Sequence, residues 1–285
     1  MECLSLFKSE QGLSAGLAYQ PTASDVFIAT YPKCGTTWVQ QLVHCLRTRG
    51  DMDFGEITDV VPWLEMSYDL GVDNNAPQKA TPKCFKSHLS WNNIPKGGRY
   101  IHVTRNPEAV LRSFYRFFEG WFFETGSISL ETFAETLFFG GSRSGIYWDH
   151  VNEWWPQRHR EDVLFLCYEH MLDDPKRLIE SVARFIKIDL DNDLLAIATE
   201  KSSADFMSRH SRQFDDHPLR EKRNAACGLP PGGSSSKANP PAGKRDKRQL
   251  PDSIREKMDQ AWHEIVERGT GLKSYENLLL EVQTE

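Results

Sequence analysis

The chain has 285 residues, of which 39% are hydrophobic and 11% aromatic, and it carries a net charge of −6 at pH 7. This length suits one large domain or two small ones, and the apolar content can fill a sizeable core. Nucleic-acid-binding proteins are more often basic, so the negative charge disfavours that class and we expect no nucleic-acid partner.

The cysteines and the first residues bear on the compartment. Six cysteines are scattered along the chain without a C-x-x-C pair. This pattern indicates reduced thiols rather than a disulfide framework or a zinc site, and we expect no bound metal. The stretch 1–8 is too short and polar for a signal peptide, and no apolar run is long enough to span a bilayer. We therefore predict a cytoplasmic protein with no membrane partner.

The first predicted elements are a strand and a helix. After a loose lead-in over residues 1–24, an apolar run at 26–29 predicts a buried strand. A helix is predicted over 36–49, because apolar side chains recur there at the spacing of one helix face: Val39, Leu42, Val43 and Leu46.

The turn between this strand and this helix predicts a phosphate-binding site. Backbone N–H groups at a helix start point outward, with the positive end of the helix dipole behind them. Gly35 lets the backbone approach an anion closely, and Lys33 adds a mobile positive charge. The alternative is an ordinary strand-to-helix turn with a chance lysine. The candidate binding residues are Lys33, Cys34, Gly35, Thr36, Thr37 and Trp38.

This turn differs from the usual nucleoside-triphosphate loop. That loop places a lysine directly after its last glycine and then a serine or threonine that binds magnesium. Here Lys33 comes two residues before Gly35. A P-loop kinase or NTPase therefore remains only as a less favoured alternative.

Further strands and helices alternate along the chain. This order predicts a single α/β domain over residues 1–285, P-loop-like, with a central and mostly parallel β-sheet flanked by helices on both faces. The predicted strands cover 83–88, 99–104 and 163–168, and the predicted helices begin at Pro107 and cover 146–158, 175–185 and 251–268.

Residues 208–250 interrupt this alternation. The stretch is rich in proline, glycine and serine in its second half and carries several basic residues. A long irregular segment in a compact domain is usually a functional lid or a solvated linker. We predict an irregular, basic lid loop here.

Polar residues follow the predicted strands at the end where open α/β sheets bind ligands. They are Lys33 after the first strand, Lys86 and His88 at the second, Arg105 at the third and Tyr168 at the fourth. His88 is the best candidate for a general base, because neutral imidazole can take a proton near pH 7. This convergence predicts one anion site with a base beside it.

Two segments carry a family resemblance: Tyr31-Pro32-Lys33-Cys34-Gly35-Thr36-Thr37-Trp38 and Lys86-Ser87-His88-Leu89. They resemble the 5′-phosphosulfate loop and the catalytic Lys-x-His-Leu segment of the cytosolic sulfotransferases. That family moves a sulfuryl group from 3′-phosphoadenosine 5′-phosphosulfate (PAPS) to small acceptors. The resemblance implies PAPS as the cofactor and His88 as the base. Lys33 and Lys86 would stabilise negative charge as the S–O bond breaks, without a metal.

The same resemblance implies a second set of cofactor contacts. Arg105 and Ser113, eight residues apart, would bind the 3′-phosphate. Trp38 would stack on adenine, and Tyr168 would hydrogen-bond to it. Ser202 or Ser203 stands where the family places a Thr-Ser pair near the adenine.

Two late family motifs are altered. An Arg-Lys-Gly triplet over the 3′-phosphate is replaced by residues 239–241, and Lys237 is the nearest candidate substitute, with Lys244 and Arg245 beyond it. This difference leaves open a catalytically weak or silent PAPS-binding protein. The family's dimer motif keeps only Lys247 and Glu256, so both a monomer and a homodimer remain possible.

The acceptor is expected to be a small phenol, alcohol or amine in an apolar pocket. Glu65, Glu119 and Glu124 are candidates to bind a cationic acceptor. Aromatic candidates for the pocket wall are Trp63, Trp91, Phe114, Phe117, Phe118, Trp121, Phe122 and Phe123.

Overall fold

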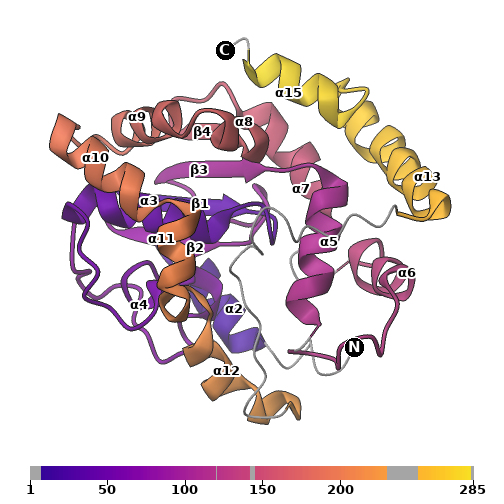
Figure 1. The fold of residues 1–285 in the computed structure, drawn as a ribbon, viewed down its shortest axis with the longest axis horizontal. Coiled ribbons are helices and arrows are strands. Elements are labelled where there is room, and N and C mark those ends of the chain that lie inside the picture. The colour runs from indigo at the N-terminus through magenta and orange to yellow at the C-terminus, as the bar shows by residue number, and fades with distance from the viewer. Residues whose placement is uncertain (1–7, 120, 142–144, 230–249, 284–285) are drawn as a thin grey trace.

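A central sheet of four parallel strands organises the chain, in the order β2-β1-β3-β4 (Figure 1). The computed structural model describes residues 8–119, 121–141, 145–229 and 250–283. Within these ranges the sheet and its flanking helices confirm the predicted fold class. The strands are β1 (Val26–Thr30), β2 (Cys84–Ser87), β3 (Arg99–Thr104) and β4 (Val163–Cys167).

Both faces of the sheet are buried, and alternate residues of each strand serve opposite faces. On β1, Val26 and Ile28 pack with the apolar faces of helices α3 (Thr36–Thr48), α9 (Pro175–Phe185) and α10 (Asn192–Lys201). Phe27 and Ala29 pack on the other face, in the core formed with helices α5 (Pro107–Phe118), α7 (Tyr147–Trp154), α13 (Asp252–Ala261) and α15 (Tyr275–Gln283). This two-sided burial explains the continuous apolar runs of the strands.

Helical structure forms in each of the predicted segments, 36–49, from Pro107, 146–158, 175–185 and 251–268, and several shorter helices were not predicted. Two segments, Ala134–Phe138 and Trp262–Glu267, are π-helical. The α-helices are α2 (Glu10–Leu17), α3 (Thr36–Thr48), α4 (Ile57–Val60), α5 (Pro107–Phe118), α6 (Leu130–Phe133), α7 (Tyr147–Trp154), α8 (Tyr168–Asp173), α9 (Pro175–Phe185), α10 (Asn192–Lys201), α11 (Ala204–Arg209), α12 (His217–Arg223), α13 (Asp252–Ala261), α14 (Arg268–Thr270) and α15 (Tyr275–Gln283).

The predicted loose lead-in over residues 1–24 is wrong in its described part, because residues 10–17 form helix α2. The Ser9 side chain accepts a hydrogen bond from the Gly12 N–H at 2.8 Å and caps this helix. The two glycines of α2 obscured its pattern in the sequence, since glycine lowers helix propensity. Both Gly12 and Gly16 are buried, where they allow α2 to lie close to its neighbours.

The predicted irregular segment 208–250 also needs correction over its first half. Helix α12 and the short helical turns Ser211–Phe214 and Ala225–Cys227 occupy this stretch. The apolar side chain of Leu219 is buried, which gives α12 the tertiary support that its polar sequence does not suggest. Residues 230–249, the second half of the predicted lid, lie outside the described residues.

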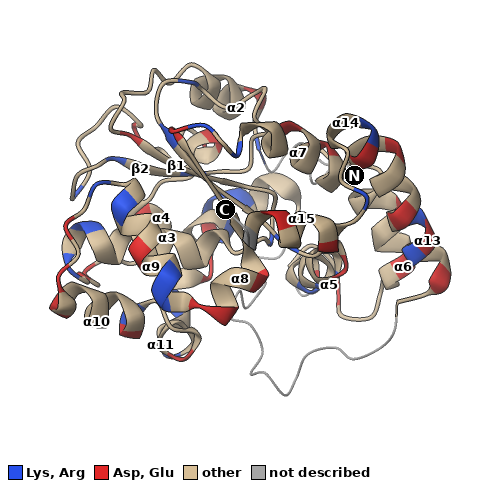
Figure 2. Cartoon of the chain, turned by 90° about the horizontal axis from the view of Figure 1, so that it is seen from above, with Lys and Arg blue, Asp and Glu red and all other residues tan. Residues whose placement is uncertain are grey.

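Charged residues of both signs alternate on the outer helices. Figure 2 shows blue and red segments interspersed along α9, α10 and α13, rather than a strip of one sign. Throughout the described ranges, no helix combines the length and the apolar character that crossing a bilayer requires.

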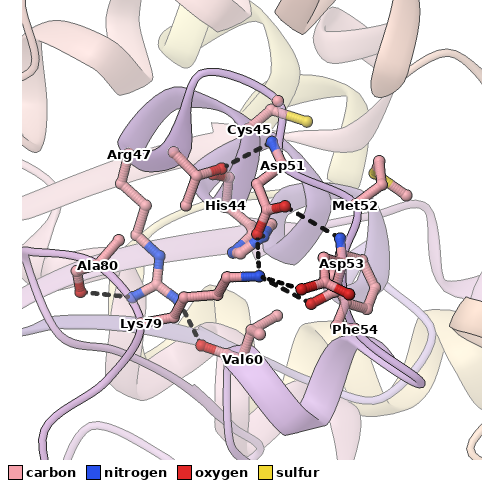
Figure 3. A network of polar contacts seen from close by, with 12 residues as sticks. His44, Cys45, Arg47, Asp51, Met52, Asp53, Phe54, Val60, Lys79 and Ala80 are labelled. Atoms are coloured by element: carbon pink, nitrogen blue, oxygen red, sulfur yellow. Dashed lines mark hydrogen bonds and ion pairs between the residues drawn. The ribbon is translucent and has the colours of Figure 1, made fainter.

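A buried arginine, Arg47, links the second half of α3 to the end of α4 and to the loop over residues 78–82 (Figure 3). The guanidinium of Arg47, 8% exposed, donates to Gln78 Oε1 at 2.7 Å and to Pro82 O at 3.0 Å, and it also bonds Val60 O. The buried His44 lies one turn earlier, and burial, followed by the charge of Arg47, lowers its pKa to about 4. This network sets the position of α3, whose first turn forms the predicted phosphate site.

We expect Arg47→Lys to lower the free energy of unfolding by about 2–3 kcal/mol, because a single ammonium cannot reach all the buried carbonyls that the guanidinium satisfies. Urea denaturation would measure the change. Arg49→Lys is the matched control, since Arg49 lies on the same helix end in an exposed pair with Asp191. Equal losses in the two variants would contradict the role of the Arg47 network.

Candidate active site

Each strand ends at the same edge of the sheet, and a predicted site residue follows three of them directly. β2 ends at Ser87 and is followed by His88, β3 ends at Thr104 and is followed by Arg105, and β4 ends at Cys167 and is followed by Tyr168. The parallel register keeps these ends side by side. The predicted convergence of these residues therefore follows from the parallel register of the strands.

The turn that is predicted to bind phosphate follows β1, and two of its residues have positive φ angles. Lys33 and Gly35 have positive φ angles of 71° and 102°, and Gly35 is the residue that precedes α3. A Cβ atom on Gly35 would lie 2.8 Å from Cδ2 of Tyr168, so only glycine allows this approach. The hydroxyls of Thr30 and Thr36 share a hydrogen bond of 2.6 Å, which joins the strand end to the first residue of α3.

Cys34 and Thr37 differ in how accessible they are to a ligand in this turn. Cys34 is fully buried, burial raises the pKa of its thiol, and its N–H donates to Tyr31 O at 3.3 Å. A ligand would therefore not meet the thiol in this conformation. Thr37 is half-buried in the first turn of α3, where its backbone N–H belongs to the helix start.

Arg105, Tyr168 and Trp38 form a wall beside the turn. The guanidinium of Arg105 lies 4.1 Å above the centre of the Tyr168 ring, and it donates to Lys33 O at 3.0 Å. Tyr168 meets the Trp38 ring edge-on at 5.8 Å. The Nε atom of Arg105 is buried and has no hydrogen-bond partner among the described residues. An oxyanion could supply that partner, so this wall suits a phosphate group and a flat base.

His88 is held with one ring nitrogen engaged. Its Nδ1 donates to the carbonyl oxygen of Thr30 at 2.8 Å, because a carbonyl can only accept, and this leaves Nε2 with the lone pair. Burial of the ring, followed by the charge of Lys86, lowers the pKa of His88 well below its usual value. The imidazole is therefore neutral at pH 7 and can accept a proton.

The second predicted lysine shares this corner with an aromatic ring and a carboxylate. The Lys86 ammonium lies 4.0 Å above the Trp63 ring and 4.0 Å from Asp216 Oδ1. Trp63 in turn meets the His88 ring edge-on at 5.1 Å. The other lysine, Lys33, lies 4.2 Å above the ring of Phe117. Each ammonium group thus lies over an aromatic ring, and one of these rings, Trp63, also contacts His88.

The predicted acceptor-pocket aromatics divide into two groups. Phe114 and Phe118 pack against Phe133 in the main core, and Trp91 packs against Trp154. The other group, Trp63, Phe117, Trp121 and Phe122, forms a smaller apolar cluster with Met66, Leu70 and Leu219. Phe117 and Phe122 also pack against the main core, as does Phe123. The smaller cluster includes the rings over which Lys33 and Lys86 lie, and its Trp63 meets His88.

The structure gives less support for three other predicted cofactor contacts, Ser113, Ser202 and Lys237. Ser113 is half-buried on α5, the helix that begins two residues after Arg105. The hydroxyl of Ser202 donates to Ala198 O at 2.7 Å within its own helix. Lys237 lies outside the described residues.

Some contacts around His88 were missed from the sequence. Its backbone N–H donates to Oε1 of Glu65 at 2.8 Å, and Lys8 lies 3.7 Å from the same oxygen. Asp216, near Lys86, comes from the segment before α12. None of these residues belongs to a motif with fixed spacing, so only the tertiary structure brings them to the base. The sequence suggested Glu65 as a candidate to bind a cationic acceptor. In the structure its Oε1 instead accepts the backbone N–H of His88.

Comparison with known proteins places this geometry in a family. The family model described as "Sulfotransferase domain" matches residues 23–269. The chain is 32% identical over 209 residues to sulfotransferase 1B1 of Canis lupus familiaris, covering 68% of this chain and 67% of that protein. It is 33% identical over 177 residues to the amine sulfotransferase of Oryctolagus cuniculus, covering 59% and 58%.

Solved structures agree on the fold. The mouse sulfotransferase SULT7A1, complexed with PAP, superposes with a TM-score of 0.66 at 17% identity and covers 98% of this chain and 95% of that chain. A retinol dehydratase in a complex with retinol and PAP gives a TM-score of 0.67 at 18% identity, covering 92% and 87%. From the domain match, the sequence relatives and this shared architecture, we conclude that the chain belongs to the sulfotransferase family.

Proposed function

We propose that the protein transfers a sulfuryl group from PAPS to a hydroxyl or amine of a small molecule, with His88 as general base. The observation that supports this most directly is the bond from His88 Nδ1 to Thr30 O, which places a neutral imidazole at the end of the strand that leads into the phosphate turn. PAPS supplies an activated sulfuryl group on a good leaving group. The structures of two similar sulfotransferase-fold proteins contain PAP, the product that remains after such a transfer.

The residues present fit this cofactor at both of its charged ends. The start of α3 and Lys33 would hold the 5′-phosphosulfate, and Gly35 lets the Tyr168 ring pack directly against this turn. Arg105, with its unpartnered Nε, and Ser113 would bind the 3′-phosphate. The adenine would lie against Trp38 and Tyr168. Ser202, Cys34, Thr36, Thr37 and Lys237 complete the proposed contact set.

The catalytic groups divide the work between proton transfer and charge stabilisation. His88 Nε2 takes the proton from the acceptor as its oxygen or nitrogen attacks. Lys33 and Lys86 stabilise the negative charge that develops on the bridging oxygen. Because Lys86 is 3% exposed, its charge acts in a poorly solvated site and is weakly screened.

The apolar cluster of Trp63, Phe117 and Trp121 favours a flat or aliphatic acceptor that bears one nucleophilic group. Phenols, alcohols and amines all meet this description. Among the similar proteins, one structure holds retinol, another holds androsterone, and one relative is named an amine sulfotransferase. All five cysteines in the described ranges are buried free thiols, which supports a reducing, cytoplasmic setting. Monomer and homodimer both remain open.

We expect His88→Ala to lower kcat by about 10²–10⁴-fold, the usual contribution of a positioned base. PAP affinity should stay within about twofold of wild type, since the base touches the acceptor rather than the nucleotide. Transfer from labelled PAPS and calorimetry with PAP measure the two effects, with the exposed His263→Ala as control. Parallel loss of transfer and binding would contradict the assigned role.

Arg105→Ala should weaken PAP binding by about 10–100-fold, because a charge-assisted hydrogen bond is worth roughly 1.5–3 kcal/mol. Adenosine 5′-phosphate lacks the 3′-phosphate, so its affinity should change by no more than about threefold. Calorimetry with both nucleotides makes this comparison. Equal weakening of both would mean that Arg105 acts only by supporting the turn through Lys33 O.

The two alternatives give different outcomes in one assay. We expect sulfuryl transfer to an acceptor panel to persist in EDTA, because the described cationic groups Lys33, Lys86 and Arg105 supply the positive charge. Magnesium-dependent phosphoryl transfer from ATP would instead establish a kinase. PAP binding with no sulfated product from any phenol, alcohol or amine would establish a silent binding protein.

A further inference from the structure

A fully buried carboxylate lies directly behind His88. Glu65 is 0% exposed and belongs to the helical turn Leu64–Met66. Its Oε1 accepts the backbone N–H of His88 at 2.8 Å, while its Oε2 is buried and has no hydrogen-bond partner among the described residues. Burying a carboxylate is costly unless its position serves a purpose or a charge compensates it. The cation nearest to it in the described structure is Lys8, 3.7 Å from Oε1.

Helix α2 presses against the backbone that carries Glu65. A Cβ atom on Gly16 would lie 2.8 Å from the Cα of Glu65 and 2.9 Å from the carbonyl oxygen of Leu64. Only glycine allows helix and turn to approach so closely. The N–H of Ser9, at the start of α2, donates to Asp69 Oδ2 at 3.1 Å and fixes the other end of the contact.

His88 is thus held at two points. Thr30 O fixes its ring, and Glu65 fixes its backbone. A hydrogen bond to a carboxylate is shorter and stronger than one to a neutral group, so Glu65 defines where the residue after β2 begins to turn. Displacement of a reacting group by about 1 Å can lower a rate by about 10²-fold.

We propose that Glu65 is a positioning residue for His88, and that α2 keeps Glu65 in place through the close contact at Gly16 and the pair with Lys8. The inference rests on the proposed role of His88 as the base. Residues 8–16 thereby belong to the machinery of the acceptor site, although they lie outside every motif that marks the nucleotide site.

The central experiment compares Glu65→Ala with Glu65→Gln, using labelled PAPS and a neutral phenol. Glu65→Ala should lower kcat by about 10–100-fold, with PAP affinity within about twofold and acceptor KM within about threefold of wild type. Glu65→Gln should recover most of this loss, because the amide oxygen can accept the same N–H. A merely structural carboxylate would not give this split between kcat and KM or this rescue.

The backbone amide of His88 supplies a direct readout. In protein labelled with ¹⁵N-histidine, its signal is identified by its loss in His88→Ala. We expect that signal to move upfield in Glu65→Gln and to show faster hydrogen exchange in Glu65→Ala, while the other histidine amides stay in place. An unchanged His88 amide in Glu65→Gln would overturn the proposal, even if the alanine variant does not fold.

The contribution of α2 is tested by Gly16→Ala, with Ser14→Ala on the exposed face of the same helix as control. Alanine favours helix over glycine, so any loss must come from the close contact and not from propensity. We expect kcat to fall about 3–10-fold in Gly16→Ala, through displacement of the turn, and to stay unchanged in Ser14→Ala. Lys8→Met should lower kcat in the same direction, and equal kcat in all three variants would overturn the role of α2.

The outcomes separate this inference from the proposed function. Wild-type kcat in Glu65→Ala, together with lost transfer in His88→Ala, would overturn the inference alone. Retained transfer in His88→Ala would overturn the proposed function instead. A raised KM for a cationic amine with unchanged kcat in Glu65→Gln would make Glu65 an acceptor contact and also overturn its positioning role.

Discussion

Thr30 joins the turn before α3 to His88, the residue that we propose as the base. Its carbonyl accepts the ring N–H of His88, and its hydroxyl bonds that of Thr36 at the start of α3. Both bonds use the last residue of β1, which lies between β2 and β3 in the sheet. The position of His88 relative to the first turn of α3 is therefore set by one buried residue rather than by loops. Any motion of α3 relative to β2 would have to break one of these bonds.

Burial keeps the imidazole of His88 neutral, and it also makes the charge of Lys86 unfavourable. The imidazole of His88 is neutral because charging it inside the protein is unfavourable and Lys86 lies nearby. The same burial would make Lys86 costly without compensation. Asp216 lies 4.0 Å from the ammonium, and the face of Trp63 lies at the same distance on another side. The corner thus holds a compensated lysine and a neutral imidazole against the same Trp63 ring, an arrangement that suits the roles we propose for Lys86 and His88.

The sheet and the nucleotide side were predictable because short sequence segments encode them. Apolar runs define the strands, and Lys33, Gly35, Arg105 and Tyr168 follow strands at fixed offsets, so their convergence comes from parallel register alone. The acceptor side was not predictable in the same way. Glu65, Lys8 and Asp216 reach the base through packing of segments that carry no periodic signal. Helix α2 was missed because the glycines that allow it to dock are the residues that weaken its pattern.

Asp69 connects two parts of the chain that are far apart in sequence. It accepts the N–H of Ser9 at the head of α2 and lies 3.6 Å from the guanidinium of Arg223 at the end of α12. During synthesis the strand–turn–helix unit that forms the nucleotide cradle leaves the ribosome early, and α12 emerges almost two hundred residues after α2. The contact between Asp69 and Arg223 can therefore form only after most of the chain has been synthesised, although the contact of Asp69 with α2 involves residues made at the start.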